Sequence, residues 1–253
     1  MPKVTIAGDK LFYVHRSSTE TDPSLLFIHG AGGTHRHWGH QLQGLDGVRR
    51  YAVDLPGHGR SGGSGQTSIR GYAEVILEFL ETLGLTQVTL VGHSMGGAIA
   101  QYLALEHPQP VQRLVLVGSG ARLRVLPSLL EVLLQDFGSA VEMMLAWAYS
   151  RECPLSIMEL GRKEWLENAP SVVHGDFAAC DSFDVMGRLG KISCPVHVLC
   201  GEDDRLTPPK YAQYLRDSIP GASLTIIPHA GHMVMVEQPE LVNQAMKEFL
   251  ASN

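Results

Sequence analysis

Residues 87–101, QVTLVGHSMGGAIAQ, constrain the fold more than any other part of the chain. The aliphatic residues at 88–91 are typical of a buried strand, and apolar residues recur at helical spacing over 98–104. The motif GHSMG lies between them, at residues 92–96. A strand that becomes a helix within so few residues holds its middle residue in strained geometry, and glycines let strand and helix approach closely. The pattern therefore predicts that Ser94 stands exposed at the tip of a tight turn.

This strand, turn and helix resemble the nucleophile elbow of the α/β-hydrolase superfamily, which has the form Gly-x-Ser-x-Gly. A second match, GRSGG at residues 59–63, continues into further glycines, with no strand pattern before it and no helix directly after it. We therefore predict that Ser94, and not Ser61, is the nucleophile. The resemblance implies an α/β fold with a mostly parallel central sheet flanked by helices.

Alternating strand and helix patterns run through most of the chain. Short apolar or β-branched runs bounded by turn residues predict strands at 4–6, 11–15, 25–28, 51–53, 88–91, 113–117, 195–200 and 223–227. The run at 25–28 contains no polar residue, which indicates a strand buried on both faces, as in a parallel sheet. Apolar residues at intervals of three and four predict a helix over 68–83 that ends at Gly84, and a closing helix is expected from about 237 to 251.

The alternation stops between residues 121 and 192, where the pattern is mostly helical. We therefore predict a core domain formed by 1–120 and 193–253, and a helical lid, 121–192, inserted after the sixth strand. Open parallel sheets bind ligands at the carboxyl ends of their strands, so the lid is expected to cover Ser94. In this lid Met143, Met144 and Trp147 are predicted to line an apolar substrate pocket, and packing within the lid explains them equally well.

The predicted strand at 25–28 ends in the glycine-rich sequence HGAGG. Such backbone can approach a ligand closely and offer an N–H group, and here it resembles the oxyanion loop of the same superfamily. By this resemblance the N–H groups of Ala31 and Met95 form the oxyanion hole, with Gly32 as the alternative to Ala31. The superfamily often places a tryptophan after this loop, so Trp38 is predicted to lie near the substrate pocket.

Four histidines fall between residues 29 and 40, and this density raises the question of a metal site. No carboxylate or cysteine accompanies them, and His-x-His followed by Trp-Gly fits none of the helical spacings that aim two ligands at one ion. We expect a surface loop and a short helix here, in which Trp38 packs inward, with no metal and no cofactor.

The resemblance also assigns an acid. The sequence GEDDRLTPP at residues 201–209 matches the spacing Gly-x-x-Asp-x-x-x-Pro of the superfamily with Asp204 as its carboxylate. Asp203 is the alternative acid. If these residues have a purely structural role, Asp203 or Thr207 caps the helix that follows.

The resemblance assigns a base near the end of the chain. The sequence PHAGH at residues 228–232 places His232 where the superfamily has its catalytic histidine, and His229 is the competitor. The resulting order of serine, acid and histidine along the chain is the order of this fold.

A serine hydroxyl needs a base within hydrogen-bond reach, and the base needs a partner that fixes its tautomer. The resemblance thus implies a serine hydrolase that cleaves a small carboxylic ester or lactone through an acyl-enzyme. The plan is similar to carboxylesterases of the 3-oxoadipate enol-lactonase type, and a serine at the elbow excludes the relatives with an aspartate nucleophile. One alternative is a carbon–carbon bond hydrolase with the same triad, although its usual His-Gly-Ser-Gly-Pro loop differs from the HGAGG found here. Another is a ligand receptor that retains the triad.

Composition limits the partners and the location. The net charge of −6, without a basic run, gives no general attraction to nucleic acid or to anionic membranes. The N-terminal residues lack a signal-peptide core, and the four cysteines lack CxxC spacing. We expect a cytoplasmic protein with reduced thiols and a small-molecule substrate, as a monomer or a homodimer.

Overall fold

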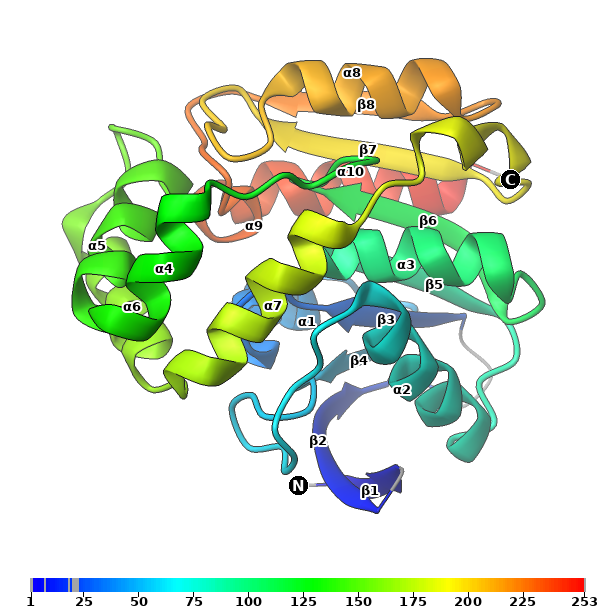
Figure 1. Cartoon of the computed structure of the whole chain (residues 1–253). Coiled ribbons are helices and arrows are strands. Elements are labelled where there is room, and N and C mark those ends of the chain that lie inside the picture. The colour runs from blue at the N-terminus through cyan, green and yellow to red at the C-terminus, as the bar shows by residue number, and fades with distance from the viewer. Residues whose placement is uncertain (1, 7, 18, 20–22, 253) are drawn as a thin grey trace.

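Within the part of the chain that the structure describes, an eight-stranded sheet crosses the centre of the molecule in the order β1-β2-β4-β3-β5-β6-β7-β8 (Figure 1). This computed structural model describes residues 2–6, 8–17, 19 and 23–252. The strands are β1 (Lys3–Ile6), β2 (Asp9–Arg16), β3 (Ser24–Ile28), β4 (Arg49–Val53), β5 (Val88–His93), β6 (Val111–Val117), β7 (Val196–Gly201) and β8 (Ser223–Ile227). In the order of the sheet, all neighbouring strands from β4 to β8 are parallel. The pairs β1–β2 and β2–β4 are antiparallel. The predicted fold class, a mostly parallel sheet flanked by helices, is confirmed.

Burial explains why the central strands are so apolar. Every residue of β3, β5 and β7 is buried. Helices α2 (Ile69–Thr82), α3 (Met95–Glu106) and α8 (Pro209–Ser218) cover one face of the sheet, and α1 (Gly39–Gly44) and α10 (Pro239–Ala251) cover the other (Figure 1). Strands covered on both faces need apolar side chains in both directions, which is the pattern found in the sequence.

Local signals set the limits of the predicted helix at 68–83. The hydroxyl of Ser68 accepts a hydrogen bond from the Gly71 N–H at 3.1 Å and caps the first turn of α2. Gly84 follows the helix with a φ of +64°, a conformation that suits glycine.

The closing helix predicted from about 237 to 251 corresponds to α10 (Pro239–Ala251), and a short helix that was not predicted precedes it. Val234–Glu237 forms the short α9, and α10 begins at Pro239. Gln238 between them has a non-helical backbone, with φ −133° and ψ 60°. The break follows from Pro239, because a proline has no N–H to donate and disfavours helical geometry in the residue before it.

Residues 121–192, which we call the inserted segment, connect β6 to β7. They form helices α4 (Pro127–Gln135), α5 (Phe137–Ala148), α6 (Leu155–Leu166), α7 (Pro170–Ser182) and η2 (Met186–Lys191). Near its two ends the N–H of Val185 donates to the carbonyl of Ala121 at 2.8 Å. The segment therefore leaves the sheet and returns at one place, and α4 to α7 stand beside the carboxyl ends of the strands (Figure 1).

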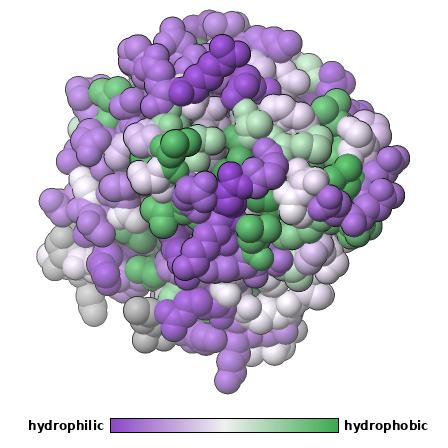
Figure 2. Space-filling model, turned by 90° about the vertical axis from the view of Figure 1, so that its left-hand side faces the viewer, coloured by the Kyte–Doolittle hydropathy of each residue, from purple (hydrophilic) through white to green (hydrophobic). Residues whose placement is uncertain are grey.

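The outer face of the inserted segment is mixed in polarity. Leu134, Leu155 and Leu160 of this segment are exposed. Hydrophilic side chains separate the hydrophobic ones over this side of the molecule (Figure 2). Among the helices in the described residues, none is both long enough and apolar enough to cross a membrane.

Candidate active site

The turn between β5 and α3 holds Ser94 in an unusual backbone conformation, with φ +50° and ψ −113°. A residue other than glycine in such a region costs on the order of 1–3 kcal/mol, and strain of this kind is concentrated at functional sites. A Cβ atom at Gly92 would overlap the Gly96 carbonyl, and one at Gly96 would overlap the Ile28 carbonyl. The glycines on either side of Ser94 therefore permit the close packing that the motif predicted.

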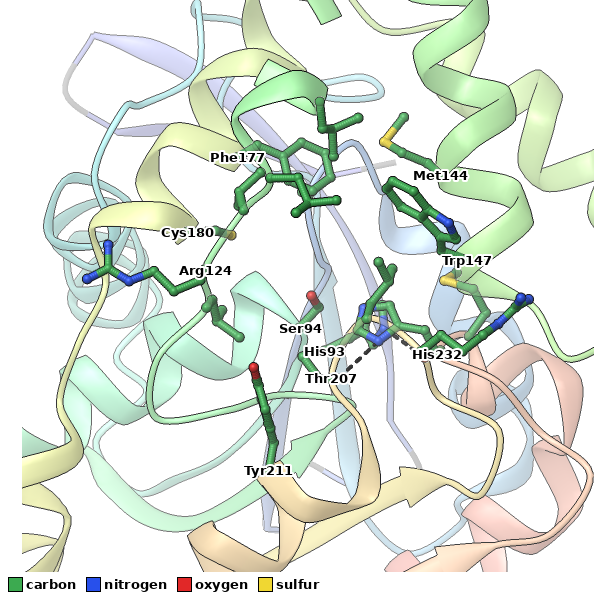
Figure 3. A pocket seen from close by; sticks show the side chains of 18 of the residues that line it. His93, Ser94, Arg124, Met144, Trp147, Phe177, Cys180, Thr207, Tyr211 and His232 are labelled. Carbon is green, nitrogen blue, oxygen red and sulfur yellow. Dashed lines mark hydrogen bonds between the residues drawn. The ribbon is translucent and has the colours of Figure 1, made fainter. Parts of the chain in front are cut away.

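Ser94 and His232 line one cavity of about 530 Å³ between the strand ends and the inserted segment. The Ser94 hydroxyl points into this cavity (Figure 3). Apolar side chains of the inserted segment form much of the wall, among them Leu129, Met144, Trp147, Trp165 and Phe177. The volume lies in the range of roughly 300–1,000 Å³ that small-molecule sites occupy.

Asp204 and His232, which are 28 residues apart in the chain, are in direct contact. The distance from His232 Nδ1 to Asp204 Oδ2 is 2.9 Å, and both side chains are buried. The N–H groups of Leu206 and Thr207 donate to Asp204 Oδ1 at 2.9 and 2.8 Å. Because Nδ1 faces a carboxylate, it carries a proton, and Nε2 is left as the proton acceptor of the ring.

Thr207 belongs to the same cluster, although the sequence suggested only a helix cap. Its hydroxyl donates to Asp204 Oδ2 at 2.8 Å and lies 3.1 Å from His232 Nδ1. The expectation that Asp203 or Thr207 caps the following helix is wrong, because α8 begins after Pro208 without a side-chain cap. The N-cap residue is Pro208, whose side chain has no hydrogen-bond acceptor.

His93, inside the GHSMG motif, is a second residue that the sequence did not single out. Its Nε2–H donates to the carbonyl of His232 at 3.0 Å, so it supports the backbone of the histidine that faces Asp204. Burial, reinforced by the neighbouring His232 ring, holds the pKa of His93 well below its usual value. His93 is therefore a neutral donor at physiological pH.

The three competing residues lie in other surroundings. Ser61 Oγ accepts from the Phe12 N–H at 2.9 Å and donates to a backbone carbonyl, so it braces a loop. Asp203 Oδ2 accepts from the Ser150 hydroxyl at 2.7 Å. The side chain of His229 is 65% exposed and pairs with a surface carboxylate. None of the three is among the residues that line the cavity.

The two predicted oxyanion donors come from different parts of the fold, Ala31 from the loop after β3 and Met95 from the start of α3. Ala31 lines the cavity, and Met95 is the first residue of α3, where N–H groups have no acceptor within the helix. The N–H of Gly32, the alternative donor, is already engaged, because it donates to Asp176 Oδ2 at 2.8 Å. The geometry therefore favours Ala31 over Gly32.

Two residues predicted for the substrate pocket lie elsewhere. Trp38 is fully buried in the core, with its ring centroid 5.0 Å from that of Phe27, because η1 (His35–Trp38) turns it toward the sheet. On α5, Met144 and Trp147 line the cavity and Met143 does not. Met143 is rotated by about 100° from Met144 about the helix axis.

The histidines of residues 29–40 serve separate hydrogen bonds. His29 Nδ1 donates to the Gly30 carbonyl at 2.8 Å, and its Nε2 accepts from the Leu55 N–H at 3.0 Å. Burial, with the nearby His58 ring, lowers the pKa of His29 to about 3. His35 bonds to Asp54 and His37 lies 3.4 Å from a carboxylate oxygen of Glu164. In the described residues no three potential ligands come together in a metal site.

Glu237 links the loop of His232 to the inserted segment. Its carboxylate oxygens accept from the Gly231 N–H at 3.0 Å and the Ser150 N–H at 2.9 Å. Burial raises the pKa of Glu237 to about 7, above its ordinary value of 4.5. The unfolded chain thus loses this proton at lower pH than the folded one. Glu237 therefore contributes stability that is fully present below the unfolded pKa and is lost as the pH rises through about 7.

We expect the Tm of Glu237→Gln, relative to wild type, to rise as the pH increases from about 5 to about 8, because only the wild type bears the growing penalty of a buried charge. Thermal unfolding followed by circular dichroism at both pH values measures this. Glu240→Gln, which changes an exposed carboxylate two residues past the helix break, is the control and should show a constant difference. A constant difference for Glu237→Gln as well would contradict the prediction.

Comparison with known proteins gives the family of the chain. The model of the alpha/beta hydrolase family matches residues 25–245. The chain is 32% identical to the 2-hydroxy-6-oxononadienedioate/2-hydroxy-6-oxononatrienedioate hydrolase of Burkholderia vietnamiensis, over 94% of this chain and 90% of that protein.

Two solved structures have the same architecture. A thermophilic esterase is 37% identical, with a TM-score of 0.87 over 98% of this chain and 96% of that one. An N-acyl homoserine lactone degrading enzyme is 28% identical, with a TM-score of 0.86 over 98% of this chain and 100% of that one. The family match spans most of the sheet, the inserted segment and the positions of Ser94, Asp204 and His232. The chain therefore belongs to the α/β-hydrolase family.

Proposed function

We propose that this protein is a serine hydrolase that cleaves a small carboxylic ester or lactone through an acyl-enzyme. One observation carries the proposal. The strained Ser94 lines the same cavity as His232, whose Nδ1 is held by Asp204 at 2.9 Å. An alcohol beside an imidazole whose other nitrogen bonds to a carboxylate is the arrangement that activates a serine.

In the proposed mechanism Ser94 Oγ attacks the substrate carbonyl while His232 Nε2 takes its proton. The N–H groups of Ala31 and Met95 stabilise the negative oxygen of the tetrahedral intermediate. His232 then gives its proton to the leaving alcohol. Water, activated by the same nitrogen, hydrolyses the acyl-enzyme. Asp204 keeps His232 in the tautomer that both steps require.

The cavity wall supports a substrate with an apolar group. Met144, Trp147 and Phe177 lie on the side of Ser94 that faces the inserted segment, and the Tyr211 hydroxyl points into the cavity from the opposite side (Figure 3). We propose that residues 121–192 act as the lid over this cavity. The esterase and lactone-degrading enzyme among the similar structures also support ester or lactone hydrolysis.

The second candidate is hydrolysis of a carbon–carbon bond in a ring-fission dienoate. It is favoured by the similarity to the Burkholderia vietnamiensis hydrolase. The same serine, histidine and aspartate would act in it. The two reactions are separated by comparing kcat/KM for p-nitrophenyl butyrate and for a 2-hydroxy-6-oxodienoate, and we expect the ester to be the better substrate.

A fluorophosphonate probe tests the nucleophile directly. We expect one label per chain, located on Ser94 by mass spectrometry of the peptides, with loss of esterase activity in proportion to labelling. Labelling requires an activated serine and an open oxyanion hole. A label on Ser61, or hydrolysis that continues in the fully labelled protein, would refute the proposal. Labelling and ligand binding without turnover of either substrate class would favour the receptor.

A further inference from the structure

The turn that carries Ala31 is fixed by bonds to its first residue. The Gly30 carbonyl accepts from the Gly33 N–H at 3.1 Å and from His29 Nδ1 at 2.8 Å. Gly32 has a φ of +63°, the conformation of the third residue in a type II turn. Because C=O and N–H point in opposite directions across a trans peptide, holding the Gly30 carbonyl also fixes the direction of the Ala31 N–H.

Both backbone groups of Gly32 are bound by side chains of the inserted segment. Asp176 Oδ2 accepts the Gly32 N–H at 2.8 Å, and Asn168 Nδ2 donates to the Gly32 carbonyl at 2.8 Å. Asp176 lies in α7, and Asn168 lies between α6 and α7. The inserted segment therefore holds the turn that the proposed mechanism uses.

The surroundings of Asp176 keep its carboxylate charged, so it binds an N–H group of the turn and not a carbonyl. Its carboxylate is fully buried and also accepts from His58 Nε2 at 2.8 Å and from the Tyr72 hydroxyl. His58 Nδ1 faces the Pro56 carbonyl at 3.0 Å, so both ring nitrogens face acceptors, and a second proton lies between the ring and the carboxylate. Burial opposes charge on this ring, but the adjacent carboxylate raises the pKa of His58 above its usual value.

A buried charge is a poor means of adding stability, because desolvation offsets most of the attraction. Its effect on geometry is more specific. If the peptide between Ala31 and Gly32 flipped, as it does when a type II turn becomes type I, the Ala31 carbonyl would turn toward the Asp176 carboxylate. Two acceptors would then face each other in a buried site, so the carboxylate excludes the flipped turn.

We propose that Asp176, assisted by Asn168, is a positioning residue. By binding the N–H and the carbonyl of Gly32, the two side chains keep the whole turn, and with it the Ala31 N–H, in place for the oxyanion. The inference rests on the proposed function, because it assumes that the Ala31 N–H stabilises the oxyanion. It adds that the inserted segment, besides covering the cavity, completes the catalytic geometry of the core.

The test is Asp176→Leu, which removes the acceptor and keeps a side chain of similar size. We expect kcat/KM for p-nitrophenyl butyrate to fall by about 10²-fold, mostly in kcat, since misplacement by about 1 Å at a reacting group has this effect. Tyr72→Phe is the matched control. It removes another hydrogen bond of the same carboxylate without touching Gly32, and its kcat should stay within a few-fold of wild type at a temperature well below the Tm of each variant.

A trifluoromethyl ketone separates positioning from general destabilisation. Ser94 Oγ adds to its carbonyl carbon, His232 takes the hydroxyl proton, and the former carbonyl oxygen becomes an oxyanion in the hole. The inhibition constant should rise in Asp176→Leu by the same factor as kcat/KM falls, while butyrate, the product, binds as it does to wild type. If Asp176→Leu does not fold, the same measurements are made on Asn168→Ala, which changes a half-buried residue.

Unchanged kcat and ketone affinity in folded Asp176→Leu or Asn168→Ala would overturn the inference, as would an equal loss in Tyr72→Phe. Failure of the proposed function has a different signature. In that case wild type itself neither hydrolyses the ester nor binds the ketone covalently.

Discussion

Replacing Ser94 by alanine is expected to lower kcat for p-nitrophenyl butyrate by about 10⁶-fold, because the residues of a serine triad act as a unit and the loss of the nucleophile removes the covalent route. KM should change little, since the hydroxyl contributes little to the apolar contacts that bind the substrate. The alanine also has to adopt the φ of +50° that Ser94 has, so unfolding should be measured in parallel. Steady-state kinetics with the variant purified away from any wild-type enzyme measures the effect.

Ser61→Ala is the matched control, because it removes the serine of the other Gly-x-Ser-x-Gly sequence. Its hydroxyl braces a loop by accepting the Phe12 N–H at 2.9 Å. The change should reduce the free energy of unfolding by about 1–3 kcal/mol through an unsatisfied donor and leave kcat within a few-fold. If Ser94→Ala retained turnover and Ser61→Ala lost it, the nucleophile assignment would be reversed.

The second large effect is expected from Asp204→Asn, with a fall in kcat of about 10⁴-fold. An amide at this position presents an N–H to His232 Nδ1 or loses the bonds from the Leu206 and Thr207 N–H groups at 2.9 and 2.8 Å. In the first case the ring proton moves to Nε2, the nitrogen that has to accept the serine proton. The loss should therefore lie in kcat, and circular dichroism should show a folded protein.

Asp203→Asn is the control at the neighbouring position. Asp203 Oδ2 accepts from the Ser150 hydroxyl at 2.7 Å, and an amide oxygen accepts the same bond. We expect kcat to stay within a few-fold of wild type. Similar losses in both variants would mean that the carboxylates act through the stability of this loop and not through the tautomer of His232.

Much of the architecture was predictable because its signals are local. The apolar runs of β3 and β7, the spacing of apolar residues in α2 and the turn glycines each depend on a few neighbouring residues. Pro239 is also a local signal, because a proline disfavours helical geometry in the residue before it, and α10 begins there, close to the predicted start at about 237.

The candidate site was predictable only in part. Resemblance to the α/β hydrolases suggested Ser94, Asp204 and His232, and the structure places His232 Nδ1 2.9 Å from Asp204 Oδ2. The pocket was not predictable, because a helix repeat does not say which face meets the cavity. Met144 and Met143 are adjacent in the sequence, yet only the former lines the cavity, and the apolar Trp38 fills the core instead.

The sequence by itself determined the strands, most of the helices and the turn that presents Ser94, since backbone preference and apolar spacing are written in neighbouring residues. Tertiary structure alone decided which distant groups meet. Asp176 is 144 residues from Gly32, and nothing near either of them in the chain indicates that they touch. A buried carboxylate needs donors from wherever packing supplies them, so its partners follow from the way the inserted segment docks on the core.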